Sequence, residues 1–218
     1  MTWKKRVSII SALSILGFAV LIENPKHFFT SSYNQIRPQI VPSGGKRCLE
    51  KLALKNIQFK SLGNVGPRNC LIKDAVRIES FSSTKLSGPV TLNCTTGLSL
   101  ANWLEEIEAT EVEHFGSYNC RKIYGTNIMS EHSFGSAVDI ASINGISLRT
   151  EWTKNSANGE YLRQAGKAAC NHFANALTPD YDAAHHDHFH LDNGYQRICP
   201  LSTLQRVKRA ALKFAAGN

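Results

Sequence analysis

The chain has 218 residues, of which 42% are hydrophobic, so it is long enough for one globular domain with short extensions. Its formal net charge of +8 is concentrated at the two ends: residues 1–47 carry seven Lys or Arg against one Glu, residues 201–218 carry four against none, and residues 48–200 carry fourteen against sixteen acidic residues. Because a nucleic-acid groove needs cations on the folded body, this distribution argues against nucleic-acid binding and suits ends that meet an anionic surface.

The first 22 residues have the layout of an export signal. A basic start, "MTWKKR", precedes the uncharged apolar run "VSIISALSILGFAVLI". No small-x-small cleavage site follows closely, so we favour a membrane signal anchor, although the run is shorter than the ~20 residues of a typical span. A cleaved signal peptide is the alternative. Residues 23–47 are predicted to form a linker, and the domain beyond it is expected in the periplasm, free or anchored to the inner membrane.

Six cysteines lie beyond the apolar run, and none forms a C-x-x-C pair. Structural zinc sites built from thiolates need close Cys pairs, whereas an even number of cysteines in an exported chain predicts disulfides. Many connectivities are possible. Pairing between neighbours along the sequence predicts three bonds, Cys48–Cys70, Cys94–Cys120 and Cys170–Cys199.

The first predicted elements of the domain are short strands followed by a helix. β-rich runs bounded by Gly, Pro, Ser or Lys predict strands at 57–60, 75–81 and 89–94. Leucine, tryptophan and isoleucine residues at helical spacing then predict a helix at 98–109.

The second half of the domain is predicted to hold a hairpin, a helix and a final strand. The stretch "SAVDIASINGISL" predicts a hairpin with a tight turn at Asn144-Gly145. Apolar residues at helical spacing predict a helix over 159–179, ending at a proline. The alternating stretch 187–192 predicts a strand.

Four of the eight histidines lie within residues 185–190. Strand alternation places His188 and His190 on one face, opposite the apolar Phe189 and Leu191. Neutral imidazoles bind Zn²⁺, and two histidines with one carboxylate leave the fourth tetrahedral position open, as in catalytic zinc sites. A solvated histidine run is the alternative that the sequence leaves open.

His132 and Asp139 are candidates for the remaining ligands of such a site. They lie seven positions apart, and Gly135 permits a tight backbone path between them. The neighbours of Asp139 are nearly all apolar, which predicts a strand buried on both faces, where an acid needs a partner or a metal. The alternative is an acid on the polar face of a hairpin.

Four motifs in order resemble the bacterial extensin-like C-terminal domain family. They are "SYNCR" (117–121), "SEHSFGSAVDIA" (130–141), "YLRQAGKAACNHF" (161–173) and "HHDHFHLD" (185–192). That family is similar in turn to the LAS-type zinc peptidases, which include D-Ala-D-Ala metallopeptidases, penicillin-insensitive murein endopeptidases and the Hedgehog signalling domain. The resemblance implies an α+β fold with a small, mainly antiparallel sheet flanked by helices, stabilised by disulfides and carrying a zinc site.

The resemblance also places the domain at 48–200 and leaves residues 201–218 as a basic tail. The tail is predicted to be either a surface helix at anionic lipid or cell wall or a frayed terminus.

Site roles follow from the resemblance residue by residue. His132, Asp139 and His190 match the three zinc ligands. His188 matches a general base, and His185 matches a second histidine of the catalytic site.

The resemblance also assigns roles to two further residues, on a weaker match than that of the three ligands. Arg121 matches an arginine that steadies the substrate or its oxyanion, and Ser130 matches a residue near the substrate. Asp187 and Asp192 could orient imidazoles of the site, and the alternative for each is an acid that faces solvent. From the alternation of the last strand, His186 is expected to point away from the site.

The implied function is an exported zinc-dependent peptidase or amidase that hydrolyses peptide cross-links of cell-wall peptidoglycan, as a D,D-carboxypeptidase or an endopeptidase. The alternatives are a non-catalytic zinc-containing module that binds cell wall or protein, and a metal-free disulfide scaffold. The expected cofactor is Zn²⁺, and the expected partners are peptidoglycan or its peptide stems and, through the N-terminal segment, the membrane.

Overall fold

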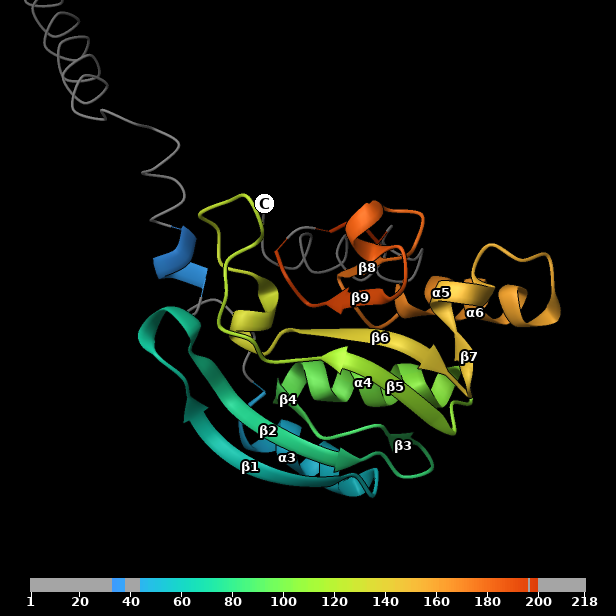
Figure 1. Ribbon diagram of the computed structural model, residues 1–218. Helices are drawn as coiled ribbons and strands as arrows, with labels where there is room; N and C mark the ends of the chain where they lie inside the picture. Colours follow the sequence, from blue (N-terminus) through green and yellow to red (C-terminus); the bar gives the residue numbers. More distant parts are fainter. Residues whose placement is uncertain (1–32, 38–43, 196, 200–218) are drawn as a thin grey trace, which may run out of the picture.

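The computed structural model of the protein describes residues 33–37, 44–195 and 197–199 (Figure 1). Residues 33–37 are helical. The later elements, in chain order, are α3 (Gly45–Leu54), β1 (Gln58–Val65), η1 (Arg68–Cys70), β2 (Ile72–Ser80), β3 (Lys85–Leu86), β4 (Val90–Asn93), α4 (Cys94–Glu106), β5 (Glu111–Gly116), η2 (Glu131–Phe134), β6 (Ala137–Ile143), β7 (Ile146–Ser147), α5 (Leu148–Glu151), α6 (Ala157–Ala169), β8 (Asn175–Leu177), η3 (Ala183–His185) and β9 (Phe189–Asp192).

The strands of the described residues form two sheets, so the α+β class predicted from the sequence is confirmed while the single small sheet is not. A three-stranded antiparallel sheet has the order β1-β2-β4, and a six-stranded sheet has the order β3-β5-β6-β9-β8 with β7 paired to β6. Within the larger sheet only the short β3–β5 pair is parallel. The site residues come from the middle of this larger sheet, at β6 and β9.

Helix α4 lies behind β5 and β6 in Figure 1 and supplies the centre of the core. It begins at Cys94, four residues before the predicted start, because the Asn93 side chain caps it by accepting a hydrogen bond from the Thr96 N–H at 2.9 Å. Trp103 is fully buried and makes edge-on contacts with Phe173 and Phe189, at centroid distances of 6.5 and 6.4 Å. The helix thereby anchors β9, which carries Phe189, against the core.

The predicted hairpin is confirmed as β6 and β7. Its turn residues Asn144 and Gly145 have φ values of 55° and 75°, the left-handed region that a tight two-residue turn requires. β6 lies between β5 and β9, and every residue in it is buried except the half-buried Asp139. The apolar run around this acid is therefore the central strand of the larger sheet.

The predicted helix over 159–179 is wrong in its second half. Helix α6 ends at Ala169, and Asn175 begins the short strand β8 that pairs with β9. The Asn175 side chain donates to Asp192 Oδ1 at 2.7 Å and accepts from the Ile198 N–H at 2.7 Å. Apolar residues at helical spacing continue in the sequence beyond Ala169, but the hydrogen bonds of Asn175 to distant residues stabilise a strand there instead of a helix.

The three disulfides are Cys48–Cys94, Cys70–Cys120 and Cys170–Cys199. The prediction of three bonds is confirmed, and so is the last pairing, but the first two predicted pairings are wrong. Pairing follows the tertiary packing rather than the order of the cysteines in the sequence. Cys48 in α3 lies beside Cys94 at the start of α4, and Cys70 in η1 lies beside Cys120 in the loop that follows β5.

In the described residues no helix combines the length and apolar character needed to cross a membrane. The predicted signal or anchor at 1–22 and the predicted tail at 201–218 lie outside those residues.

Candidate metal centre

Three side chains converge where β6 and β9 meet the short helix η2. The His132 Nε2 atom lies 3.1 Å from Asp139 Oδ2 and 3.2 Å from His190 Nδ1, and His190 Nδ1 lies 2.9 Å from Asp139 Oδ1. Among the described residues these three form a group that could hold a metal ion, with one ligand atom from each within 4.8 Å of the others. The structure thus brings together the three residues that the resemblance assigns as ligands.

The local fold places each ligand. Asp139 and His190 are direct cross-strand partners in the antiparallel β6–β9 pair, so their side chains share one face of the sheet. His132 arrives from η2, which ends at Gly135 with a φ of 61°. A side chain at Gly135 would come within 2.8 Å of the Asn93 backbone nitrogen, so both the backbone conformation and the close approach require glycine here.

Hydrogen bonds to the outer ring nitrogens fix which atoms face the site. His132 Nδ1 donates to the Ser117 carbonyl at 2.5 Å, because a carbonyl can only accept. His190 Nε2 donates to Asp192 Oδ2 at 3.1 Å. The lone pairs of His132 Nε2 and His190 Nδ1 therefore point at each other and at the Asp139 carboxylate, and such a set of acceptors suits a cation.

Asp192 is itself held in place. Its Oδ1 accepts from Asn175 Nδ2 at 2.7 Å and from the Gly194 N–H at 2.6 Å, and the residue is only 5% exposed. The expectation that Asp192 orients an imidazole agrees with this geometry.

Without a metal, protons must satisfy the converging acceptors. Burial opposes ionisation of Asp139, but hydrogen bonds from His132 and His190 and their charges hold the pKa of Asp139 well below its usual range. Burial would lower the pKa of His190, but hydrogen bonds to Asp139 and Asp192 and their negative charges raise it to about 9. A proton on His190 thus occupies the place that fits a cation.

The metal-free protein is expected to lose stability as the pH rises from about 6.5 to about 9. The pKa of His190 is about 9 in the folded state and ~6.5 in an unfolded chain, so its proton stabilises the fold fully below pH 6.5 and this contribution is lost by pH 9. Bound Zn²⁺ would replace the proton and remove the dependence. The measurement is the melting temperature across this pH range, once with a chelator and once with saturating zinc. If the melting temperature changed with pH in the same way under both conditions, the prediction would be contradicted.

His188 and His185 lie beside the three ligands. His188 Nδ1 contacts Asp187 Oδ1 at 2.9 Å, which leaves its Nε2 3.8 Å from Asp139 Oδ1. His185 Nδ1 contacts Asp182 Oδ1 at 2.6 Å. The His185 ring lies 5.3 Å from the His188 ring and 5.7 Å from the His190 ring, centroid to centroid, so these three of the four histidine rings in residues 185–190 lie close together.

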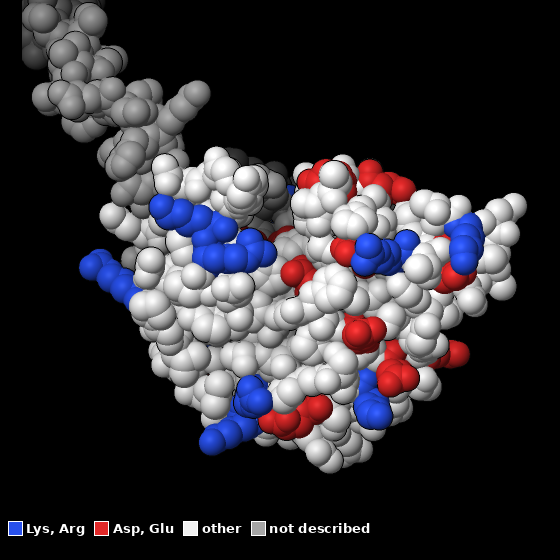
Figure 2. All heavy atoms as spheres, in the orientation of Figure 1, with Lys and Arg blue, Asp and Glu red and all other residues white. Residues whose placement is uncertain are grey.

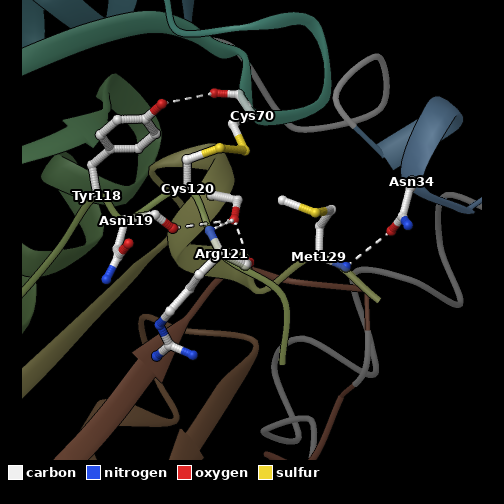
Figure 3. Close-up of a disulfide and its surroundings, with 8 residues drawn as sticks. Asn34, Cys70, Tyr118, Asn119, Cys120, Arg121 and Met129 are labelled. Carbon is white, nitrogen blue, oxygen red and sulfur yellow. Dashed lines mark hydrogen bonds between the residues drawn. A yellow bond between two sulfur atoms is a disulfide. The ribbon is translucent and has the colours of Figure 1, made fainter. Parts of the chain in front are cut away.

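Arg121 and Ser130, which the sequence predicts to lie near the substrate, are in different environments. Arg121 is exposed, and its backbone N–H donates to Ser133 Oγ at 3.0 Å. Its side chain extends away from the Cys70–Cys120 disulfide (Figure 3). Ser130 is 5% exposed and caps η2, its Oγ accepting from the His132 N–H at 3.4 Å. Contact of either residue with a substrate stays a prediction.

His186 and His172 lie outside the ligand set. The His186 side chain is 59% exposed, in agreement with its expected orientation. His172 pairs through Nε2 with Glu106 Oε2 at 2.5 Å. Both residues therefore serve as controls for the histidines of the site.

Sequence reasoning missed two residues that orient the site histidines. Ser117 acts through its backbone carbonyl, which leaves no side-chain signal. Asp182 caps η3 by accepting from the Ala184 and His185 N–H groups, and an aspartate three residues before a histidine was the available signal.

Comparison with known proteins gives one finding. No curated protein matches the chain, and no solved structure matches it. One family model, described as "Extensin-like protein C-terminus", matches residues 46–200. This match covers more than half of the chain and contains every residue of the candidate metal centre, so the protein belongs to the extensin-like C-terminal domain family.

Proposed function

We propose that the protein is an exported zinc-dependent peptidase or amidase that hydrolyses peptide cross-links of cell-wall peptidoglycan. The observation that carries the proposal is the set of three converging acceptors, His132, Asp139 and His190, with a fourth histidine, His188, beside them. Two imidazoles and one carboxylate are the ligands of catalytic zinc sites, whereas Mg²⁺ and Ca²⁺ prefer oxygen ligands throughout. The reaction class is supported by the resemblance, inferred from the sequence motifs, to the LAS-type peptidases.

Each residue beside the ligands has a role in this reaction. Bound zinc would lower the pKa of a water to ~7 and polarise the scissile carbonyl. His188 Nε2 accepts the proton of the attacking water and returns it to the leaving amine, while Asp187 holds the opposite ring nitrogen as the donor. His185, oriented by Asp182, lies close enough to share this proton transfer. For the exposed Arg121, the role rests on the resemblance alone: its guanidinium would offset the charge that develops on the carbonyl oxygen.

The surface around the site supports binding of a large polar substrate. Phe115 is 61% exposed and contacts the His188 ring at 5.7 Å, and Tyr181 is 52% exposed and contacts the His185 ring at 5.7 Å. Figure 2 shows Lys and Arg atoms gathered over the loop between β5 and η2, with Asp and Glu atoms beside them toward β9. Exposed rings suit stacking against sugars or peptide planes, and mixed charges suit stem peptides that carry both signs.

Export is supported by the cysteines. Three disulfides form and persist in an oxidising compartment outside the cytoplasm. We therefore place the protein in the periplasm or at the periplasmic face of the inner membrane, held there by its N-terminal segment.

When zinc is present, the full chain is expected to release smaller peptide products from cross-linked fragments of purified peptidoglycan, which a muramidase makes soluble beforehand. Mass spectrometry of the products would identify the bond that is cleaved. Removal of the metal with a chelator is expected to stop release, and added Zn²⁺ is expected to restore it. Release that continues undiminished after zinc removal would show that the converging acceptors are not the catalytic centre.

A further inference from the structure

The helical segment 33–37, which the sequence predicts to be part of a linker, is bonded to the loop that carries the metal motif. Asn34 Nδ2 donates to the Asn127 carbonyl at 2.7 Å, and the Met129 N–H donates to Asn34 Oδ1 at 2.9 Å. Figure 3 shows Asn34 reaching this loop from the segment, near the Cys70–Cys120 disulfide. The contact joins parts of the chain about ninety residues apart, which a free tether would not do.

The strongest contacts of this segment are with Glu131, the residue directly before His132. Arg37 Nε donates to Glu131 Oε1 at 2.9 Å, Arg37 Nη2 donates to Glu131 Oε2, and Tyr33 Oη donates to Glu131 Oε1 at 3.1 Å. Arg37 is only 2% exposed, and its guanidinium lies 5.4 Å from the centre of the buried Phe134 ring, at the end of η2. An arginine is rarely buried to this degree unless its charge is paired.

The Glu131 carboxylate also connects to the residues that orient His190. Its Oε2 accepts from Ser136 Oγ at 2.6 Å, and the Ser136 carbonyl accepts from the Asn193 N–H at 3.0 Å. A side chain at Gly194 would lie 2.7 Å from both the Glu131 carboxylate carbon and Asp192 Oδ1. Glu131 is therefore packed between the turn that bears His132 and the carboxylate that binds His190 Nε2.

We propose that Arg37 and Tyr33 are positioning residues of the metal centre, acting through Glu131 to hold His132 and the Asp192–His190 pair at their spacing. The segment 33–37 is then a structural part of the site domain, although it precedes the region matched by the family. Residues that orient ligands in this way commonly change metal affinity by ~10–100-fold when they are removed. The inference rests on the metal site proposed above but on no enzymatic activity.

The test is zinc affinity of the full chain, measured at 25 °C by competition with a chromophoric chelator. Arg37→Met keeps the apolar stem and removes the charge, and it is expected to weaken zinc binding by ~10–100-fold. Tyr33→Phe removes one hydrogen bond and is expected to weaken binding severalfold. Arg37→Lys, which keeps the charge but not the two-pronged geometry, is expected to restore part of the affinity. The control is Arg77→Met, because Arg77 is an exposed arginine paired with Glu79, and it is expected to leave affinity unchanged.

The absorption spectrum of the Co²⁺-substituted protein separates positioning from a merely structural role. A structural role lowers the melting temperature and leaves the zinc affinity and the Co²⁺ spectrum of the folded protein unchanged, whereas positioning changes both. Folded Arg37→Met and Tyr33→Phe proteins with wild-type affinity would overturn the inference, and Tyr33→Phe alone decides it if Arg37→Met does not fold. A wild-type protein without zinc binding overturns both the metal site and the inference, while zinc binding without peptide release overturns only the proposed peptidase.

Discussion

Replacing His190 by alanine is expected to abolish tight zinc binding and, with it, peptide release. The His190 Nδ1 atom lies 2.9 Å from Asp139 Oδ1 and 3.2 Å from His132 Nε2, so its loss leaves two of three ligands. The loss in affinity is expected to exceed the ~10–100-fold typical of an orienting residue. The change also leaves Asp192 without one hydrogen-bond partner, at a cost of about 1–3 kcal/mol in the free energy of unfolding.

Zinc content of the purified variant, measured by elemental analysis, checks this expectation, with circular dichroism to confirm folding. The matched control is His172→Ala, because His172 is also half-buried and also bonded to a carboxylate, that of Glu106, but lies outside the ligand set. The control is expected to keep about one zinc ion per chain. Wild-type affinity in His190→Ala would refute the three-residue site.

Two of the three candidate ligands, Asp139 and His190, could be singled out from local sequence patterns, while the resemblance to the family completed the set with His132 and chose His190 over His188. Asp139 is an acid within a run of apolar residues. In the later stretch 187–192, the alternation of side chains places His190 on the face opposite the buried Phe189. The tight turn at Asn144-Gly145 fixes the hairpin from two residues alone. In each case the physical cause of the structure lies within a few residues of the feature.

The wrong disulfide pairings have the opposite cause. Cys48 bonds Cys94, at a separation of 46 residues, rather than the nearer Cys70. The entropy of closing a loop grows only slowly with its length, so proximity along the chain is a weak guide. The contact between α3 and α4 decides the pairing, and α3 itself was not predicted from the sequence.

The role of Arg37 could not be predicted either. It lies among Pro, Ser, Asn and Gly residues that are typical of a linker, and its partner Glu131 is 94 residues away. Only the folded structure shows that this arginine is buried. A linker composition describes the local chain and says nothing about a distant carboxylate that one of its side chains can reach.

Replacing His188 by alanine is expected to leave zinc bound while lowering the rate of peptide release by about 10²–10⁴-fold, the contribution of a positioned general base. His188 is not among the three converging ligands, and its Nε2 lies 3.8 Å from Asp139 Oδ1. Its partner Asp187 has a pKa lowered by the hydrogen bond from His188, so it stays ionised near neutral pH and can hold the ring in place. The measurements are zinc content and the initial rate of product formation from peptidoglycan.

His186→Ala is the matched control, since His186 is two residues away and 59% exposed, and its rate is expected to equal that of the wild type. The comparison separates the peptidase from a zinc-containing module that only binds cell wall or protein. A module retains zinc and wall binding and shows no difference between the two variants, because neither histidine then has a proton to move. A peptidase shows a rate loss in His188→Ala alone, and this loss at constant zinc content assigns the proton transfer to His188 rather than to the integrity of the metal centre.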